Sequence, residues 1–345
     1  MSQPEPARTL FALSPAEAET AVVRLGGRAF HARIARREAC ARGLLDYAAM
    51  TSLPAELRAR LAAELPLVSA RETARRTARD GTVKLLLAFP DGRTVETVWI
   101  PSRKSGTGAT LCVSTQVGCP VRCPFCASGK DGLVRNLEWP EIVEQYLFGR
   151  AVGALARSVV MGIGEPLLNY ANLLRALEFV RGELGLGARK ITVSTVGFPE
   201  RLERAAADDP AFQLAISLHS PDDEQRWELV PAMRGVPVED VLAAGDRWFE
   251  RTGRELTYEY VLLGGTNDSP GHAARLAARL RGRRASVNLI PYNPVDEAGY
   301  ARPDAETAER FRRVLVDAGV VATVRWSRGL ESDAACGQLR IRAGK

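Results

Sequence analysis

The sequence has no apolar run long enough to cross a bilayer. Its first residues, Met1-Ser2-Gln3-Pro4-Glu5-Pro6, also lack the basic start and apolar core of a signal peptide. These absences predict a cytoplasmic chain with no membrane partner. There is no low-complexity segment, and a chain of 345 residues is long enough for one large domain with an appendage.

Cysteine is scarce, with six in the chain, and three of these stand together in Cys119-Pro-Val-Arg-Cys123-Pro-Phe-Cys126. Cytosolic thiols stay reduced unless they bind metal or react. Three soft thiolates this close together indicate a metal centre. A 4Fe–4S cubane suits them, because three cysteines leave one iron open to bind a small molecule. A closed zinc knuckle, completed by Cys112 or Cys336, is the alternative.

Positive charge is unevenly distributed along the chain. The net charge is +6, and residues 1–80 hold 13 arginines and 9 acids but no lysine. A second basic block, 275–284, contains five arginines and no acid. Both blocks favour a polyanionic partner, and solvated helix faces are the alternative.

The first hundred residues carry helix signals followed by a hairpin signal. Ser14-Pro15-Ala16-Glu17 is a capping box with proline at the first helical position. Pro90-Asp91-Gly92 is a turn between two apolar runs. The elements expected here are helices from Ser14, over 29–48 and over 55–65, and strands over 82–89 and 94–100.

From residue 110 onward, short β-rich runs alternate with helical patterns, which predicts parallel strands with crossover helices. The expected strands are 111–114, 158–161, 190–194, 213–218, 255–262 and 286–290. The expected helices lie near 139–149, 170–184, 199–207, 237–251, 270–282 and 304–318. Six strands make an open, partial TIM-like (βα)6 barrel the simplest α/β fold. The active site of such a barrel lies at the carboxyl ends of the strands.

Polar motifs stand where four of these strands end. Gly164 lets a ligand approach the backbone closely, and Glu165 can accept from an ammonium group. Ser194, Ser217 and His219 can bind a sugar or a carboxylate, and Asn293 can read an adenine edge. Each residue alone is more often part of a turn. Because these motifs all lie at the carboxyl ends of the predicted strands, together they predict a binding site.

Two more cysteines lie outside the loop but suggest reactivity. Cys336 stands among small residues in Asp333-Ala-Ala-Cys336-Gly-Gln338, where a nucleophile can move toward a substrate. Cys112 precedes the first loop cysteine by seven residues. For both, a buried hydrophobic role is the alternative.

These segments together resemble the RlmN/Cfr family of radical S-adenosylmethionine (AdoMet) RNA methyltransferases, and RlmN-like members most. The resemblance covers nearly the whole chain. The similar stretches are Val95-Glu96-Thr97-Val98, 112–126, 164–169, 217–219, 258–263, 287–294 and 333–339. The resemblance implies a radical AdoMet barrel with one 4Fe–4S cluster on Cys119, Cys123 and Cys126. The AdoMet contacts that it implies are Gly164, Glu165, Ser194, Ser217, Leu218, His219 and Asn293.

The resemblance also implies a two-step reaction. Cys336 takes a methyl group from one AdoMet, and a radical from a second AdoMet then removes a hydrogen from the S-methyl group. The resulting carbon radical adds to an adenine ring carbon. Glu96 accepts the ring proton, and Cys112 resolves the adduct, leaving a transient disulfide with Cys336.

The implied substrate is carbon 2 of one adenine in 23S ribosomal RNA, and some members also modify transfer RNA. A smaller branch methylates carbon 8 and confers antibiotic resistance, and 195–197 and 219–221 would suit it. The chain departs from the family pattern at Val196 and at Gly329-Leu330-Glu331-Ser332. The implied partners are these RNAs and an electron donor such as flavodoxin or ferredoxin, with the protein a monomer.

Four regions are therefore expected: a helical, basic RNA-binding accessory domain over 1–80, a β-hairpin extension over 81–104, the barrel over 105–320, and a segment over 321–345 that carries Cys336. Two other classes stay open at this point. One is a non-catalytic RNA-binding protein with a metal knot. The other is a radical AdoMet enzyme acting on a peptide or a small molecule.

Overall fold

A computed structural model describes residues 9–104, 106–295, 298–329 and 333–339. The strands are β1 (Arg71–Thr77), β2 (Val83–Ala88), β3 (Thr94–Ile100), β4 (Ala109–Cys112), β5 (Gln116–Gly118), β6 (Leu133–Asn136), β7 (Leu155–Val160), β8 (Ile191–Thr195), β9 (Gln213–Ser217), β10 (Leu256–Leu262), β11 (Ala285–Pro291) and β12 (Val321–Val324). The helices are α1 (Pro15–Arg24), α2 (Ala29–Arg42), α3 (Ala55–Glu64), α4 (Trp139–Val152), α5 (Tyr170–Glu183), α6 (Pro199–Ala207), α7 (Asp223–Leu229), α8 (Val238–Thr252), α9 (Pro270–Leu280) and α10 (Ala305–Asp317). Short 3-10 turns lie at η1 (Leu10–Ala12), η2 (Tyr47–Ala49), η3 (Ala127–Gly129), η4 (Pro166–Asn169), η5 (Ala188–Lys190) and η6 (Pro231–Met233).

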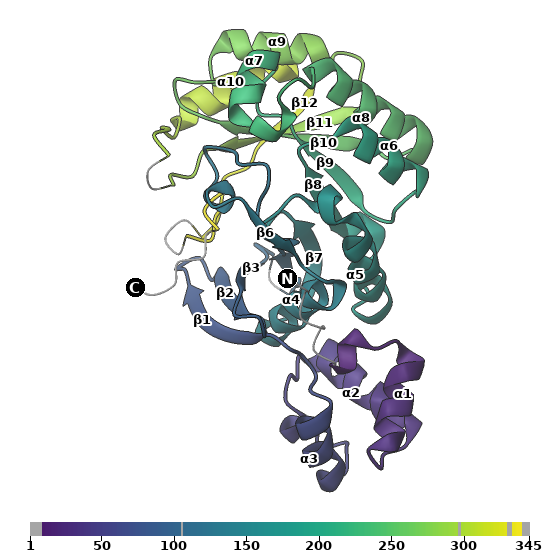
Figure 1. Ribbon diagram of the computed structural model, residues 1–345. Coiled ribbons are helices and arrows are strands. Elements are labelled where there is room, and N and C mark those ends of the chain that lie inside the picture. The colour runs from purple at the N-terminus through teal and green to yellow at the C-terminus, as the bar shows by residue number, and fades with distance from the viewer. Residues whose placement is uncertain (1–8, 105, 296–297, 330–332, 340–345) are drawn as a thin grey trace.

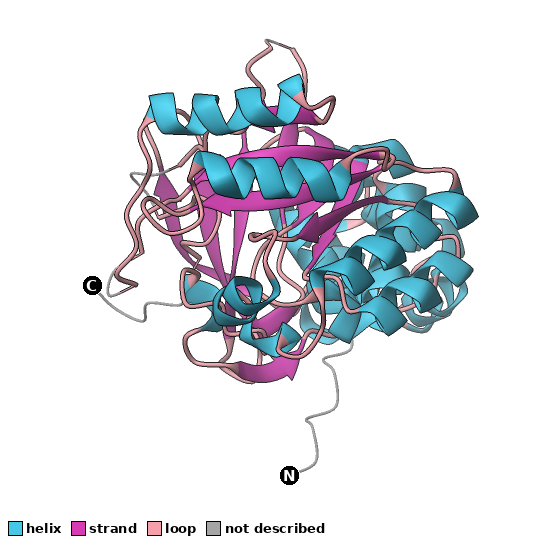
Figure 2. Ribbon diagram, turned by 90° about the horizontal axis from the view of Figure 1, so that it is seen from above, coloured by secondary structure: helices cyan, strands magenta, loops and turns pink. Residues whose placement is uncertain are grey.

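One sheet runs through the molecule in the order β1-β2-β3-β4-β7-β8-β9-β10-β11-β12. Its first four strands are antiparallel neighbours, and from β4 onward all neighbours are parallel. Helices line the outer side of the strands (Figure 2). This arrangement confirms the predicted α/β fold, an open, partial barrel that carries a β-hairpin and a helical extension. None of the described helices is both long enough and apolar enough to cross a membrane.

Four strands, β1, β5, β6 and β12, fall where the sequence did not predict them. β5 and β6 pair with each other in a separate two-stranded sheet. β1 lies in the region expected to be helical, and it extends the hairpin to a third antiparallel strand. All seven of its residues are exposed, so it lacks the alternation that marks a strand. β12 pairs with β11 and adds a further parallel strand. Residues 71–77 therefore pair with the predicted hairpin, and residues 321–324 extend the parallel part of the sheet.

The helical extension, α1 to α3, lies at one end of the molecule (Figure 1). It meets the barrel through Arg36, a buried arginine. Arg36 of α2 pairs with Glu183 at the end of α5, with 2.5 Å between Nη2 and Oε1. Its Nη1 donates to the carbonyl of Leu10 at 3.1 Å. The guanidinium also lies 5.0 Å from the ring centroid of Phe11 and 5.6 Å from that of Phe179. Arg36 therefore joins the extension to the barrel.

We expect Arg36→Met to lower the free energy of unfolding by about 3 kcal/mol, because it leaves Glu183 without its buried partner. Chemical denaturation of the full chain measures the change. Arg33→Met is the matched control. Arg33 pairs with Glu19 on the surface with 64% of its side chain exposed, so its loss is expected to cost about 0.5 kcal/mol or less. Equal losses in the two variants would contradict the role given to Arg36.

Candidate active site

The carboxyl ends of the parallel strands open into one cavity with about 950 Å³ of space, its mouth included. Ten of the thirteen predicted site residues line it. They are Cys119, Cys123, Cys126, Gly164, Glu165, Ser194, Ser217, His219, Asn293 and Cys336. The other three, Glu96, Cys112 and Leu218, are buried and do not line it. Residues spread over more than 200 positions thus meet at one sheet edge, as parallel order predicts.

The three loop cysteines meet in this cavity with the properties of metal ligands. Burial, reinforced by nearby thiolates, raises the pKa of Cys119 to about 12 and that of Cys123 well above its usual value. Burial also raises the pKa of Cys126. A cationic metal centre removes this cost by binding the thiolates, so the donor set fits a 4Fe–4S cluster. Among the described residues, no His, Cys, Asp and Glu side chains converge on a single ion. The ligands of a 4Fe–4S cubane do not have to converge on a single ion, because each cysteine binds a different iron.

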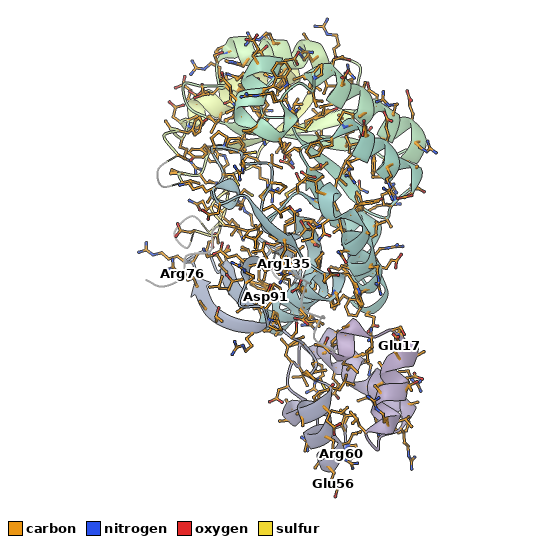
Figure 3. All side chains as sticks on the ribbon, in the orientation of Figure 1. Glu17, Glu56, Arg60, Arg76, Asp91 and Arg135 are labelled. Atoms are coloured by element: carbon orange, nitrogen blue, oxygen red, sulfur yellow. The ribbon has the colours of Figure 1, made fainter. Side chains whose placement is uncertain are left out.

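The loop is anchored at both ends. The Cys119 N–H donates to the Gly132 carbonyl at 3.0 Å, next to the small β5–β6 sheet. On β6, which follows the loop, Arg135 pairs with Asp91 of the hairpin turn at 2.6 Å and with Glu141 of α4 at 2.7 Å. Arg135 and Asp91 lie side by side in Figure 3. The hairpin and α4 therefore hold the strand that leaves the cluster loop.

The turn after β7 is shaped for a ligand. Gly164 has φ +115°, and a Cβ there would lie 2.8 Å from the Cβ of Gln116, so only glycine fits. The Glu165 carboxylate is buried and accepts from Thr195 Oγ1 at 2.6 Å and from the Val196 N–H at 2.9 Å. A carboxylate has about four acceptor sites, so it can still bind an ammonium group. The departure at Val196 leaves this contact intact, because a backbone N–H makes it. Leu330, Glu331 and Ser332, from the other departure, lie outside the described residues.

The ends of β8 and β9 place three further polar groups in the cavity. The hydroxyl oxygens of Ser194 and Ser217 are 3.3 Å apart. His219 follows β9 with φ +63°, and its Nδ1 accepts from the Val261 N–H at 3.1 Å. Burial, reinforced by the charge of Arg226, lowers the pKa of His219 to about 3. The imidazole is therefore neutral, and this bond places its proton on Nε2.

Two residues predicted to contact AdoMet, Leu218 and Asn293, form hydrogen bonds with other residues of the protein. Leu218 is buried, and its N–H donates to the Glu259 carbonyl at 2.9 Å, so its side chain lies outside the cavity wall. Asn293 does line the cavity, but its Nδ2 donates to the Cys336 carbonyl at 2.9 Å, and its Oδ1 accepts from Arg302 at 3.0 Å. In this structure, Asn293 positions the Cys336 segment.

The Cys336 segment is also tied to the cluster loop. The Ala127 N–H, one residue after the third loop cysteine, donates to the Gly337 carbonyl at 2.8 Å. Ser128 Oγ donates to the Leu339 carbonyl at the same distance. The residues that follow Cys336 are therefore held beside the predicted cluster loop by hydrogen bonds to their carbonyls.

Cys112 lies beneath this segment, at the end of β4. It belongs to a small apolar cluster with Val98, Ile163, Ala334 and Leu339. Burial raises the pKa of Cys112 to about 12 and also raises that of Cys336, and Arg325 opposes both shifts. Both cysteines are free thiols, so the predicted disulfide is not formed in this structure. The Cys336 thiol lies near enough to add to the rise in the pKa of Cys112.

Glu96 on β3 lies beside the same segment. Lys84 Nζ is 2.8 Å from Glu96 Oε1 and 3.0 Å from the Asp333 carbonyl. Both side chains are buried. One ammonium group thus joins the predicted base to the segment that carries Cys336.

Sequence reasoning missed Lys84, Glu259, Arg226 and Arg325, all close to the site. The first two could have been found, because each is a charge within an apolar strand. Lys84 stands within β2, and Glu259 stands between two tyrosines of β10. Arg226 and Arg325 could not have been found in this way, because the residues that surround them in the structure are distant from them in sequence.

Both basic blocks contain arginines that pair with acids. In the block 275–284, Arg275 pairs with Asp222, Arg283 with Glu239, and Arg284 with Glu255. These pairs favour the solvated-face interpretation of that block. On β1 the arginines are exposed along an edge strand, where Arg75 pairs with Glu72 and Arg76 with Asp333. Arg76, labelled in Figure 3, projects from that edge.

The fold and the site together define a radical AdoMet enzyme, and residues 113–277 match the Radical SAM superfamily. The chain is similar to the crystal structure of a radical SAM methyltransferase from Sphaerobacter thermophilus. The two share 42% identity and a TM-score of 0.88, over 96% of this chain and 99% of that one.

Relatives narrow the class further. The chain is 45% identical to a probable dual-specificity RNA methyltransferase RlmN of Rhodopirellula baltica, over 93% of this chain and 87% of that protein. It is also 45% identical to an RlmN of the same description from a Synechococcus species, over 96% and 97%. The chain therefore belongs to the RlmN family of radical SAM RNA methyltransferases, whose cofactors are a 4Fe–4S cluster and AdoMet. The non-catalytic and the peptide or small-molecule alternatives are thereby set aside.

Proposed function

We propose that the protein methylates carbon 2 of one adenine in 23S ribosomal RNA through an S-methyl group on Cys336. The observation that carries this proposal is the position of Cys336. It lines the same cavity as the three loop cysteines, and both Cys112 and the Lys84–Glu96 pair lie against its segment.

Carbon 2 of adenine is electrophilic and offers no lone pair, so direct polar transfer from AdoMet to it is poor chemistry. The cluster and AdoMet, when bound, supply radical chemistry that can attack such a carbon. The protein must then provide a methyl carrier, a base for the ring proton, and a thiol that breaks the thioether link. Cys336, Glu96 and Cys112 are the residues of this chain suited to those three tasks.

Cys119, Cys123 and Cys126 would hold the cluster. Gly164 would let AdoMet approach the backbone, and Glu165 would accept from its ammonium group. Ser194, Ser217 and His219 present hydroxyl and N–H groups in the same cavity for its polar parts. Asn293 would serve mainly by holding Cys336, and Leu218 by shaping the wall. These roles suit the hydrogen bonds that each residue already makes.

Glu96 would take the adenine ring proton. Lys84 would hold the Glu96 carboxylate in place beside the Cys336 segment. The thiol of Cys112 would attack the sulfur of Cys336 and form a disulfide. The electron pair of the broken carbon–sulfur bond would stay on the methylene carbon, which takes up a proton to become the methyl group.

RNA would dock on the hairpin side of the molecule. Exposed arginines line β1, and Arg76 lies 3.6 Å from Asp333 of the Cys336 segment. The helical region before β1 would extend this surface as an accessory domain. The dual specificity named for relatives suggests transfer RNA as a second substrate. A flavodoxin or ferredoxin would supply electrons to a monomeric enzyme.

Mass spectrometry of nucleosides tests the proposal. The anaerobically reconstituted protein, reductant and AdoMet are incubated with protein-free large-subunit RNA, and the RNA is then digested. We expect methyl on adenine carbon 2. Methyl on carbon 8 would move the protein to the resistance branch. AdoMet cleavage without any methyladenosine would reject the substrate.

A further inference from the structure

Trp326 is the largest of the exposed apolar side chains in the described part of the chain, with 42% of its surface exposed. It stands two residues after Val324, the last residue of β12, which runs parallel to β11. The chain therefore carries Trp326 to the carboxyl edge of the sheet, where the cavity opens. Tryptophan is highly buried on average, so its exposure at this edge requires a reason.

The neighbours of Trp326 connect it to the wall of the cavity. Arg302 lies 5.5 Å from the ring centroid of Trp326, and its Nη1 donates to Asn293 Oδ1 at 3.0 Å. Ser327, the next residue, accepts at its Oγ from Asn293 Nδ2 at 2.8 Å. The same Nδ2 group donates to the Cys336 carbonyl at 2.9 Å, and both Asn293 and Cys336 line the cavity. Trp326 is therefore part of the cavity rim, beside the Cys336 segment.

Arg302 adds a positive charge to this part of the rim. Burial lowers its pKa, and no acid in the described residues lies close enough to oppose that shift. An arginine nevertheless stays charged at neutral pH. An indole ring and a guanidinium together suit single-stranded RNA, because the ring stacks on bases and the cation attracts phosphates. An apolar protein segment would use the ring but would leave this charge without a partner.

The chemistry of the site also requires a surface of this kind. An adenine carbon can reach Cys336 only when the base leaves its stack and enters the cavity. That movement removes stacking from the adjacent bases, and aromatic side chains can replace it. We propose that Trp326 stacks on a nucleobase next to the methylated adenine and so holds the RNA over the cavity. The inference rests on the proposed methylation of an RNA base, but it holds whichever carbon is modified.

The competing explanation is that Trp326 only packs on Arg302 and thereby holds the Cys336 segment in place. Two substitutions separate stacking from packing. Trp326→Leu keeps apolar bulk but removes the aromatic face, whereas Trp326→Tyr keeps an aromatic ring. Trp139→Leu is the matched control, since Arg175 lies 4.5 Å from the ring centroid of Trp139 but neither residue lines the cavity.

The experiment measures methyl transfer by the anaerobically reconstituted full chain to protein-free large-subunit RNA and to transfer RNA. We expect the KM for RNA to rise about tenfold in Trp326→Leu, the loss typical of one stacked base, with kcat little changed. Trp326→Tyr and Trp139→Leu should stay close to wild type. Binding of RNA should also quench the tryptophan fluorescence of the wild type more than that of Trp326→Tyr, a comparison that does not need the leucine variant.

Methylation of Cys336 in the absence of RNA, measured by mass spectrometry of the intact protein, separates the two explanations. We expect the wild-type level in Trp326→Leu. A lower level would show that Trp326 positions the Cys336 segment and would overturn the proposal. An unchanged KM in Trp326→Leu, an equal rise in Trp326→Tyr, or equal quenching in the wild type and Trp326→Tyr would also overturn it. If the wild type methylates neither RNA, the proposed function fails separately, and the quenching comparison decides whether Trp326 contacts RNA.

Discussion

Replacing Cys336 with alanine is expected to abolish RNA methylation, to below about a thousandth of the wild-type rate, while the cluster remains in place. In the proposed reaction every methyl group passes through this sulfur, so no other residue can take its place. The cluster should survive, because the segment is held by backbone groups at Gly337 and Leu339 and not by the thiol. Methyladenosine in digested RNA and the iron content of the protein measure the two outcomes.

Cys40→Ala is the matched control for this variant. Cys40 is also buried, but it lies in α2, where its sulfur is 3.9 Å from Glu183. We expect it to methylate RNA at the wild-type rate. Wild-type turnover by Cys336→Ala would reject the S-methyl intermediate. Loss of the cluster together with activity would show that Cys336 supports the cluster site and would leave its role as carrier without support.

The alternating part of the fold was predictable from the sequence for a physical reason. Each barrel strand is a short apolar run that must be covered by the helix after it, so the periods of strand and helix alternate along the chain. All six expected strands and the six helices between and after them are present. The helix predicted from the Ser14 capping box is also present, with both capping bonds formed.

β1 and β12 escaped prediction because their own residues carry little pattern. β1 consists of exposed polar residues and exists because β2 offers it a partner edge. β12 has four residues and is placed by β11. In both cases the neighbouring strand determines the structure, and single-sequence patterns do not contain that neighbour.

The same distinction holds for the site. That the strand-end motifs share an edge follows from parallel order alone, and the cavity agrees. The hydrogen-bond partner of each site residue could not be predicted. Asn293 donates to the Cys336 carbonyl. The Leu218 N–H donates to the Glu259 carbonyl, and the Leu218 carbonyl accepts from Arg226. Those contacts depend on where distant loops cross, which spacing does not encode.

Replacing Cys112 with alanine is expected to trap the protein covalently on RNA. In the proposed reaction the methylene carbon links adenine to the sulfur of Cys336 until another thiol attacks that sulfur. Cys112 is the suitable thiol, because it lies under the Cys336 segment in the same apolar cluster. Its pKa of about 12 means that it must be activated as the reaction proceeds, and Arg325 is the cation that favours its thiolate.

Denaturing gels measure this outcome, since a protein linked to RNA migrates more slowly and returns to its free position after nuclease digestion. We expect most of the Cys112→Ala protein to shift in a single turnover, with little free methyladenosine. The double variant Cys112→Ala/Cys336→Ala should show no shift, because the link runs through Cys336. The Cys40→Ala variant should release product normally. If Cys112→Ala releases methylated RNA without a shifted band, Cys112 does not resolve the adduct. Water or another thiol would then have to break the link, and the position of Cys112 beneath the segment would be explained by packing alone.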